Sequence, residues 1–374
     1  MHCDVLIAGG GPAGLAAAIA LRQRGADVLL ADALRPPIDK ACGEGLMPDS
    51  HRDLARLGVD LRAGGGAEFR GMVFADEGAR VSADFPQGPG IGMRRTALQR
   101  LLVDRASELG VRMLWNTPLL AKNGRLLIAG NCCHYRWLVG ADGLGSRLRA
   151  WAGLETGTIR SRRYGFRAHF RVAPWGPHVE VHWGRLGQAC ITPVGSQEIS
   201  VSAMSRIPGV RLGDVVGAIP FLCGKLAGAA QTTRERGSLT VTRQLARVTL
   251  GNVALVGDAS GSIDAITGEG LALGFRQALL LAESLEAGGL EPYEAGHSGI
   301  LALPRRMAAL LLRMDGAPWL RRRALEAMAA RPELFRGLLA VHVGHEPLSR
   351  FVLRHGAKAG ILLLPGRRQA TGAA

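Results

Sequence analysis

The pattern of apolar and polar positions at the start of the chain predicts a strand, a helix and a second strand. Residues 5–7 form a short apolar run that is typical of a buried strand. Residues 15–22 form an alanine-rich helical segment, which Gly25 ends, and residues 27–31 form a second apolar run. Strands that alternate with helices in this way are typical of a parallel sheet.

Further along the chain the spacing of the apolar positions changes. Residues 96–109 are expected to form a helix, because their leucines fall on one helical face. Residues 164–205 alternate with a period of two, which predicts antiparallel strands of a half-exposed sheet. Residues 297–364 predict helices, with breaks expected at Pro304, at residues 316–318, at Pro332 and at Pro347.

The turn between the first strand and the first helix carries glycines at the spacing G-x-G-x-x-G. Gly9 allows a tight turn, Gly11 lets a pyrophosphate approach the backbone, and Gly14 lets the helix pack close to the strand. Asp32 ends the second apolar run, where an acidic side chain accepts hydrogen bonds from a ribose. This context predicts a dinucleotide site at the positive end of the helix dipole; the alternative is a glycine-rich turn that binds nothing.

Two later segments each contain a short strand that ends in an aspartate. The first reaches Asp142 and Gly143 and continues into a basic helix start. The second reaches Asp258 and continues through a glycine-studded loop into a helix from about Leu271. Taken singly, either aspartate could cap a helix or a turn without binding a ligand.

Together, the three motifs resemble those of the FAD-dependent oxidoreductases built like para-hydroxybenzoate hydroxylase and of the related geranylgeranyl reductases. The resemblance covers residues 1–150 and 250–285. It implies an α/β fold with a Rossmann-like FAD-binding domain (GR2-type), an interleaved antiparallel-sheet substrate domain and a C-terminal helical cap. The expected boundaries are 1–70, 93–155 and 250–290 for the FAD-binding domain, 71–92 and 156–249 for the substrate domain, and 291–374 for the helical region.

The resemblance also implies which residues bind FAD. Asp32 would hold the adenosine ribose, Asp258 would bind the ribityl chain, and residues 268–271 would bring a helix N-terminus to the pyrimidine edge of the flavin. That edge becomes negative on reduction, and a helix N-terminus favours negative charge. The full set is Gly9, Gly11, Pro12, Ala13, Gly14, Asp32, Arg95, Asp142, Gly143, Asp258, Gly268, Gly270 and Leu271.

The segment 42–48 is similar to the Cys-Gly-x-Gly-Leu loop of geranylgeranyl-reductase-like members, which would bring it to the flavin ring. Cys42 is either an active-site thiol or a small packing residue. Glu44 is an acid–base candidate if it is buried, and a solvated loop carboxylate otherwise. The expected substrate contacts are Gly45, Trp183 and Pro193, although aromatic residues such as Trp183 more often pack a core.

The resemblance implies a single-component monooxygenase that takes electrons from transiently docked NAD(P)H and uses O2 to hydroxylate an aromatic or polyketide-like molecule. One alternative is a reductase that saturates isoprenoid or polyene double bonds, and another is a flavin-binding protein without turnover. For each of the two enzymatic alternatives, this sequence differs from the pattern of the corresponding family at one site. Residues 189–193 lack the aromatics of the reductases, and Asp264 stands where the aromatic hydroxylases have proline.

The composition of the chain indicates its cellular compartment and argues against metal and nucleic-acid partners. The 374 residues contain no apolar run long enough for a membrane span and no signal-peptide pattern. The six cysteines have no zinc-like spacing, which predicts reduced thiols, no metal and a cytoplasmic protein. The net charge of +15 comes mainly from arginine, without a nucleic-acid motif. The basic C-terminal helices could contact an anionic membrane surface or simply present a solvated arginine face.

Overall fold

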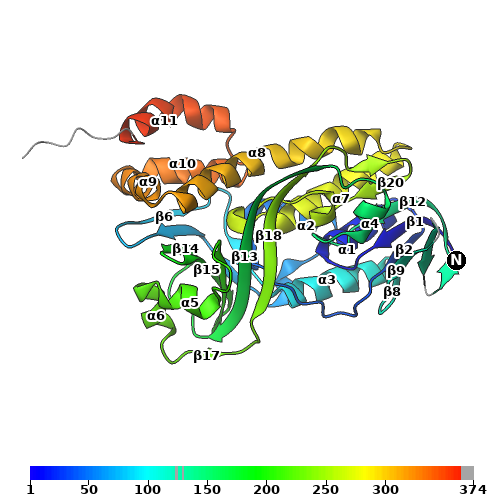
Figure 1. Ribbon diagram of the computed structural model, residues 1–374, viewed down its shortest axis with the longest axis horizontal. Coiled ribbons are helices and arrows are strands. Elements are labelled where there is room, and N and C mark those ends of the chain that lie inside the picture. Colours follow the sequence, from blue (N-terminus) through cyan, green and yellow to red (C-terminus); the bar gives the residue numbers. More distant parts are fainter. Residues whose placement is uncertain (123–124, 129, 364–374) are drawn as a thin grey trace, which may run out of the picture.

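The computed structural model describes residues 1–122, 125–128 and 130–363, and two large sheets dominate it (Figure 1). One sheet has six strands in the order β19-β20-β12-β1-β2-β8. Five of its strands, β1, β2, β8, β12 and β20, run parallel, and β19 pairs antiparallel with β20. The bounds are β1 His2–Ala8, β2 Val28–Ala31, β8 Arg112–Leu114, β12 His134–Gly140, β19 Thr249–Leu250 and β20 Val253–Leu255.

Three helices bury one face of this parallel sheet. They are α1 (Pro12–Arg22), α3 (Arg95–Glu108) and α7 (Gly270–Glu286). Alanines and leucines of α1 pack against the strand residues Val5 and Ile7 on one side and Phe275 of α7 on the other. The predicted strand–helix–strand order and the Rossmann-like α/β class are thereby confirmed.

The second sheet contains eight strands and carries the period-two pattern. Its order is β17-β13-β16-β15-β14-β5-β6, and β18 also pairs with β13. The pairs are antiparallel as predicted, except that β14 runs parallel to β5. The bounds are β5 Gly71–Ala75, β6 Arg80–Asp84, β13 Gly157–Arg171, β14 His178–Gly184, β15 Gly187–Gly195, β16 Glu198–Ser205, β17 Ala230–Gln231 and β18 Arg236–Leu245.

The strand β13 has two chemically different faces. Phe166, Ala168 and Phe170 pack into an apolar cluster with the short helices α5 (Leu212–Gly217) and α6 (Pro220–Leu226). On the opposite face, Arg163, Arg167 and His169 are at most 2% exposed. Since side chains alternate along a strand, this arrangement points three polar groups of one strand in the same direction.

Smaller elements connect the two sheets. A three-stranded sheet, β3 (Gly45–Leu46), β7 (Gly90–Gly92) and β4 (Ala67–Phe69), holds the end of the Cys42 loop. The remaining elements are α2 Pro48–Arg56, α4 Arg147–Trp151, β9 Leu119–Lys122, β10 Arg125–Ile128, β11 Asn131–Cys132, and the 3-10 turns η1 Leu61–Gly64, η2 Gly257–Ser260 and η3 Ala265–Thr267.

The C-terminal helices form a layer along one side of the molecule (Figure 1). They are α8 Glu291–Gly316, α9 Pro318–Ala330, α10 Pro332–His342 and α11 Leu348–Leu363. The breaks predicted around 316–318, at Pro332 and at Pro347 occur, but the break predicted at Pro304 is wrong. The helix α8 continues through a buried Pro304, because apolar packing of its face, including Leu301 and Leu311, outweighs one lost backbone hydrogen bond.

No helix within the described part of the chain is both long and apolar enough to cross a bilayer. The division of the chain into three domains, with the boundaries given above, stays a prediction.

Candidate functional site

The three sequence motifs meet at one edge of the parallel sheet. The strands β1, β2, β12 and β20 end at Ala8, Ala31, Gly140 and Leu255, directly before the loops that carry the motifs. Because parallel strands share a carboxyl edge, the four loops lie together where nucleotides bind in doubly wound folds.

The glycine turn forms a close-packed cradle at the start of α1. Gly9 has φ +115°, and a Cβ at Gly14 would collide with the carbonyl oxygen of Gly9. At Gly11, by contrast, a Cβ would meet only the Arg95 guanidinium, at 3.9 Å. The N-terminus of α1 has no side-chain cap and no acidic residue in its first turn. This open approach to a helix N-terminus suits a pyrophosphate.

Asp32 lies beside the glycine turn, as its predicted role requires. One carboxylate oxygen accepts a hydrogen bond from the Gly10 N–H at 2.6 Å, and the other accepts from the Leu34 N–H at 2.7 Å. Each oxygen keeps a lone pair for a ribose hydroxyl. The side chain is therefore oriented for such contacts, and its ribose-binding role stays a prediction.

Two cations and one carboxylate surround the space in front of Gly11. A Cβ at Gly143 would lie 3.5 Å from the Lys40 ammonium. The Asp258 residue is exposed, but the protein packed around its carboxyl displaces part of the hydrating water, and this desolvation raises the pKa. The positive charges of Lys40 and Arg95 act in the opposite direction and lower it. The structure thus gathers the residues predicted for the pyrophosphate and ribityl contacts, and it adds Lys40, which the motifs did not reveal.

Asp142 makes the local contacts of the capping alternative given in the sequence analysis. Its carboxylate accepts a hydrogen bond from the Leu148 N–H at 3.1 Å and another from the Ser146 hydroxyl, at the start of α4. These contacts are those of a helix-capping residue. Asp142 and Gly143 still lie at the carboxyl edge of the sheet, so their contact with FAD stays a prediction.

The helix α7 points its N-terminus toward the same edge. Gly268 adopts φ +70°, and α7 begins at Gly270 with no acidic residue in its first turn. The packing of α1 on α7 is close, since a Cβ at Gly274 would lie 3.1 Å from that of Ala13. The free N–H groups of this helix end suit a negatively charged flavin edge.

Glu44 is buried, so it is not the solvated loop carboxylate that was one of its two expected environments. It is 2% exposed and adopts φ +62°. One oxygen lies 2.6 Å from His169 Nε2, and the other accepts from the Arg95 N–H at 2.9 Å. The Arg167 guanidinium lies 3.7 Å away. The carboxylate thus ties the Cys42 loop to both β13 and α3, and a catalytic role for it stays a prediction.

Cys42 lies two residues before Glu44 in the same loop. Its Sγ accepts a weak hydrogen bond from the Glu44 N–H at 3.4 Å. Burial raises the pKa of the thiol above its usual value, with Arg95 acting in the opposite direction. Cys42 is therefore a neutral thiol at physiological pH, which suits proton donation rather than nucleophilic attack.

Gly45 and Pro193 both adjoin Gly92, since Gly45 pairs with it and a Cβ at Gly92 would meet the Pro193 carbonyl, whereas Trp183 lies elsewhere. Contact of these residues with a substrate stays a prediction. Thr192 donates to the carbonyl of Gly43 at 2.8 Å, and a Cβ at Gly45 would lie 3.8 Å from Thr192. Trp183 pairs with Gln188 at the other end of the β14–β15 hairpin and is 2% exposed. The structure thus separates it from the other predicted substrate contacts by about 16 Å along β15.

Two functional candidates on β13, Arg167 and His169, were missed in the sequence analysis. Their signal was present, because polar residues at alternate positions of an otherwise apolar strand indicate a buried polar face. Their partners lie 125–128 positions away, so nothing local in the sequence links them.

A narrow apolar cavity of about 40 Å³ lies between the helical layer and the second sheet. Ile266 and Thr267 of η3 line one end, directly before the Gly268 loop, and His342 of α10 is the one titratable residue of the lining. Its Nδ1 lies 3.7 Å from a Glu269 oxygen, and neither atom has a hydrogen-bond partner among the described residues. The apolar lining is Met72, Phe74, Met307, Leu310, Leu311, Met314, Met328, Phe335, Leu338 and Leu339.

Known proteins support the assignment of this edge to FAD. Residues 2–183 match the model of a family described as an FAD binding domain. A menaquinone reductase of Mycolicibacterium smegmatis is 28% identical, with 88% of this chain and 91% of that protein aligned. An anhydrotetracycline hydroxylase from Streptomyces rimosus is 27% identical, with a TM-score of 0.69 over 92% of this chain and 76% of that one. A flavoprotein/dehydrogenase from Cytophaga hutchinsonii shares the fold, with a TM-score of 0.82 at 17% identity over 97% and 99% of the two chains.

Proposed function

Because the chain belongs to the superfamily of FAD-dependent oxidoreductases built like para-hydroxybenzoate hydroxylase and the geranylgeranyl reductases, we propose that it is a reductase of an isoprenoid substrate. The reaction would saturate one carbon–carbon double bond of a long apolar chain. NAD(P)H would dock transiently as the source of electrons.

The apolar cavity beside η3 is the observation that carries this proposal. It begins next to the loop expected at the flavin edge and extends among the C-terminal helices. Four methionines line it, and methionine side chains rearrange readily around irregular apolar ligands. An extended hydrocarbon chain could therefore enter by displacing these side chains, whereas a polar ring substrate would leave its polar groups unpaired there.

FAD, held by the residues at the carboxyl edge of the parallel sheet, would supply the two-electron hydride chemistry between NAD(P)H and one carbon of the double bond. The protein must then supply a proton to the other carbon. Cys42 is the donor we propose, because burial keeps its Sγ protonated and its loop is expected at the flavin ring. The resulting thiolate would be stabilised by Arg95 until a proton from solvent restores the thiol.

The buried pair of Glu44 and His169 would close the site on the side of the second sheet. Together with Arg167 it holds the Cys42 loop against β13 through side chains that are themselves buried. Exclusion of water would strengthen the electrostatic contacts inside the site. In this proposal Glu44 is a positioning residue and Cys42 is the catalytic one.

The menaquinone reductase aligns over nearly the whole chain, which supports the isoprenoid reading. The anhydrotetracycline hydroxylase supports the second candidate, a monooxygenase that uses O2 to hydroxylate an aromatic or polyketide-like molecule. The two activities share the FAD edge and differ in their need for oxygen.

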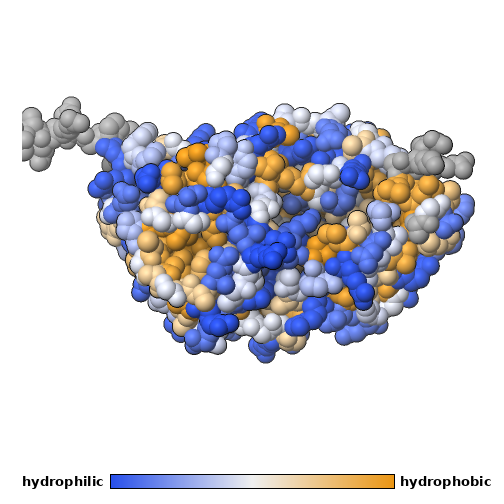
Figure 2. Space-filling view, turned by 60° about the horizontal axis from the view of Figure 1, so that its bottom comes forward, coloured by the Kyte–Doolittle hydropathy of each residue, from blue (hydrophilic) through white to orange (hydrophobic). Residues whose placement is uncertain are grey.

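A lipid substrate would be collected at a membrane surface. The face shown in Figure 2 carries separate apolar patches divided by a hydrophilic band, so we place the contact on the C-terminal helices instead. In α11, Val352 and Leu353 are 54% and 91% exposed beside Arg350 and Arg354. Exposed apolar groups next to arginines suit an anionic bilayer surface.

The test is the oxygen dependence of product formation. FAD-loaded protein would receive NADPH or NADH and a menaquinone under strict anaerobiosis, with products followed by mass spectrometry. We expect a product that gains two hydrogen atoms, at a rate unchanged by air. A product that gains oxygen, and forms only in air, would overturn the reductase in favour of the monooxygenase.

A variant that fills the apolar cavity tests whether the isoprenoid substrate binds there. Leu310 lines the apolar cavity and is 39% exposed, so Leu310→Trp can fill the cavity without a buried clash. We expect KM for the isoprenoid to rise while FAD affinity stays unchanged. The matched control is Leu250→Trp, at a similarly exposed leucine of β19, which should change neither quantity.

A further inference from the structure

A second, larger cavity lies at the far end of the second sheet. It has a volume of about 390 Å³, within the range of small-molecule sites. The turn between β14 and β15, the end of β16 and the start of α9 line it. Gly187 at this end of β15 and Pro193 at the other are about 20 Å apart along the strand, so this cavity is separate from the FAD edge.

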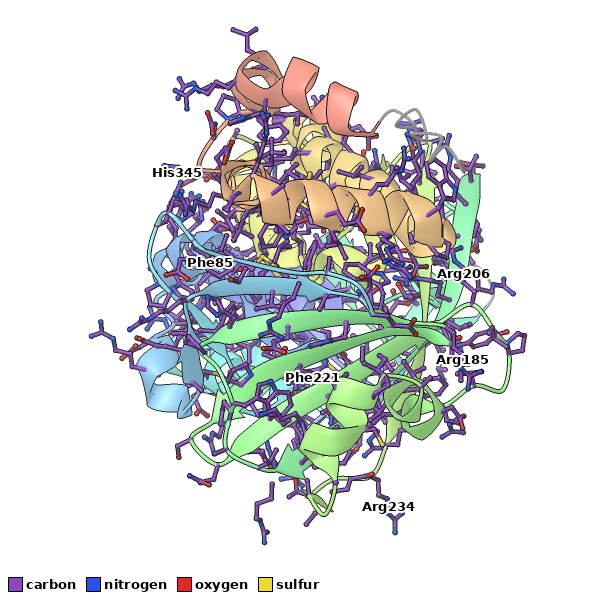
Figure 3. The ribbon with its side chains drawn as sticks, turned by 90° about the vertical axis from the view of Figure 1, so that its left-hand side faces the viewer. Phe85, Arg185, Arg206, Phe221, Arg234 and His345 are labelled. Carbon is purple, nitrogen blue, oxygen red and sulfur yellow. The ribbon has the colours of Figure 1, made fainter. Side chains whose placement is uncertain are left out.

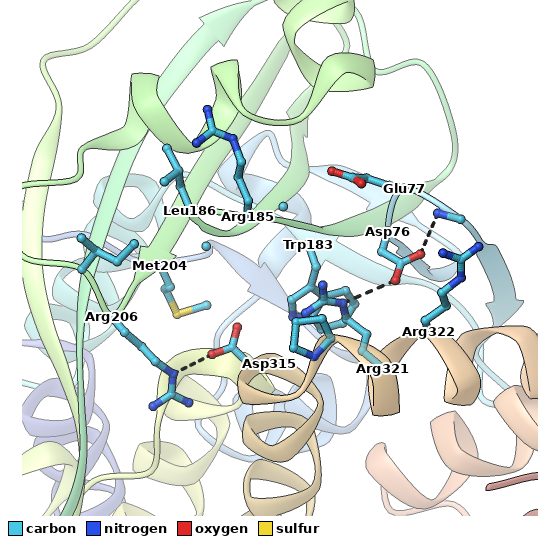
Figure 4. Close-up of a pocket in the computed structure, with 15 residues that line it drawn as sticks. Asp76, Glu77, Trp183, Arg185, Leu186, Met204, Arg206, Asp315, Arg321 and Arg322 are labelled. Carbon is cyan, nitrogen blue, oxygen red and sulfur yellow. Dashed lines mark hydrogen bonds and ion pairs between the residues drawn. The ribbon is translucent and has the colours of Figure 1, made fainter. Parts of the chain in front are cut away.

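Four arginines line this cavity, from the turn between β14 and β15, the end of β16 and the start of α9. Figure 4 shows Arg185, Arg206, Arg321 and Arg322 on different sides of Trp183. Arg185 has no hydrogen bond or ion pair with any described residue, and it is exposed. Guanidinium groups present several N–H donors in a planar fork, the geometry that binds phosphate oxygens.

The acidic residues of the lining leave much of this donor capacity unused. Asp315 accepts from Arg206 at 3.1 Å, and Asp76 lies 3.5 Å from Arg321 Nε. The third acid, Glu77, is exposed. Four arginines against three acids give the lining a net positive charge. Arg322 Nε also pairs with Glu326, which lies outside the lining, at 3.0 Å, and each of these ion pairs occupies only part of a guanidinium.

Two buried donors in the lining have no hydrogen-bond partner. Trp183 is 2% exposed and Arg321 is 8% exposed, yet the indole N–H of the first and the Nε of the second donate to no described residue. The Arg321 Nε still has an ion-pair partner, Asp76 at 3.5 Å, whereas Trp183 Nε1 has no partner among the described residues. An unsatisfied buried donor of this kind is rare in folded proteins and indicates a missing acceptor. Both lie in the cavity wall (Figure 4).

The helix α9 adds a third independent feature. Its first residue, Pro318, lines the cavity, and its first turn contains no acidic residue and no side-chain cap. The positive end of a helix of 13 residues therefore faces the same space as the arginines. Arg321 and Arg322 lie in this first turn and its continuation.

From these features we propose that the cavity is a binding site for a phosphate group, distinct from the FAD site. The arginines would take the phosphate oxygens, with the α9 N-terminus and the indole N–H of Trp183 completing the contacts. The phosphate belongs either to a soluble phosphate ester or to a phospholipid headgroup. The exposed apolar side chains of Ile207 and Trp319 at or beside the rim are compatible with the second source.

The site is connected to the flavin edge by buried ion pairs. Asp315 pairs with both Arg206 and Arg163, and Arg163 pairs with the fully buried Asp264. Asp264 caps η3, which leads into the Gly268 loop. Asp264, which stands where the aromatic hydroxylases have proline, is therefore linked through Arg163 to Asp315 in the cavity wall.

The test measures phosphate binding to the FAD-loaded protein at constant ionic strength. Inorganic phosphate and glycerol 3-phosphate would be titrated calorimetrically, and phosphatidylglycerol vesicles would be tested by co-sedimentation. We expect Arg185→Ala and Arg322→Ala each to weaken binding by about tenfold. Binding of the soluble esters identifies a metabolite site, and binding of vesicles alone identifies a headgroup site.

The matched control is Arg234→Ala. Arg234 is an exposed arginine outside the cavity lining, and Figure 3 shows it at the bottom of the molecule, away from Arg185 and Arg206. We expect this variant to bind as the unmodified chain does. If none of the three probes binds, or if Arg234→Ala weakens binding as much as Arg185→Ala, the proposal is overturned, because the attraction would then reflect net charge alone. Neither readout depends on catalysis, so a failure of the proposed reaction would not affect it.

Discussion

Glu44 and His169 are 125 positions apart in the chain, yet an oxygen of the first lies 2.6 Å from Nε2 of the second. Both are buried, and the contact joins the Cys42 loop to the second sheet. Burial of a carboxylate is costly unless it is paired, and Glu44 has three partners. This contact therefore holds together the two layers that enclose the site.

Glu44→Gln is expected to destabilise the protein by about 1.5–3 kcal/mol. The substitution preserves shape but removes the charge that Arg167, His169 and the Arg95 N–H share. Denaturant unfolding of both forms measures the difference. Glu108→Gln is the control, since its exposed ion pair with Arg105 contributes about 1 kcal/mol or less. Equal losses in the two variants would contradict the buried arrangement.

Gly11→Ala is expected to abolish FAD binding without unfolding the protein. A Cβ at Gly11 has open space around it, with Arg95 at 3.9 Å, so the FAD-free protein tolerates it. The same Cβ would occupy the approach of the pyrophosphate. Visible absorbance after gel filtration measures retained FAD, and circular dichroism measures folding. Gly224→Ala, where a Cβ meets nothing within 4 Å, should remain yellow. A yellow Gly11→Ala protein would exclude this placement of the pyrophosphate.

Acidification is expected to destabilise the protein through His297. Burial, reinforced by Arg305, lowers the pKa of this imidazole from 6.5 to about 4, against the opposing effect of Glu294. Between these values the unfolded chain binds the extra proton, so stability falls as pH decreases from about 6.5 to 4. The loss is on the order of 3 kcal/mol.

Unfolding free energies measured across this pH window test the assignment. His297→Gln should flatten the dependence, because the group whose pKa differs between the folded and the unfolded chain is gone. His2→Gln, at an exposed histidine, should leave the slope unchanged. An unchanged slope in His297→Gln would show that other groups cause the acid lability.

Cys42→Ser is expected to lower kcat by about 10²–10⁴-fold while FAD affinity stays unchanged, because a hydroxyl is a weaker proton donor than a thiol. Cys190→Ser is the control, at a second thiol whose pKa burial raises to about 11. Steady-state kinetics and FAD titration of both variants decide the matter. If turnover survives in Cys42→Ser, the thiol has no catalytic role.

Local patterns in the sequence were enough to predict the parallel sheet, and they point to its carboxyl edge as the place of the ligand. Gly9, Gly11 and Gly14 act within one turn, and the strands that carry Asp32 and Asp258 are short apolar runs with one carboxyl edge. Such features depend on the chemistry of neighbouring residues. They need no knowledge of how distant segments meet.

The enclosing wall of the site could not be predicted in the same way. Lys40 reaches Gly143 because of the path of a loop, and His169 reaches Glu44 because of which face of β13 turns inward. Trp183 lies at the far end of its hairpin because register, rather than composition, sets its position. Even Pro304, a strong local signal, was overridden by the packing of α8.

The two faces of β13 make this strand intolerant of changes in length. An insertion or deletion of one residue before Arg163 would rotate the arginines and His169 toward α5 and bring the phenylalanines against Glu44 and Asp264. Both carboxylates would lose their partners in one step. Homologues should therefore vary in the identity of the residues along this segment while keeping their number, with any gaps confined to the turns at its ends.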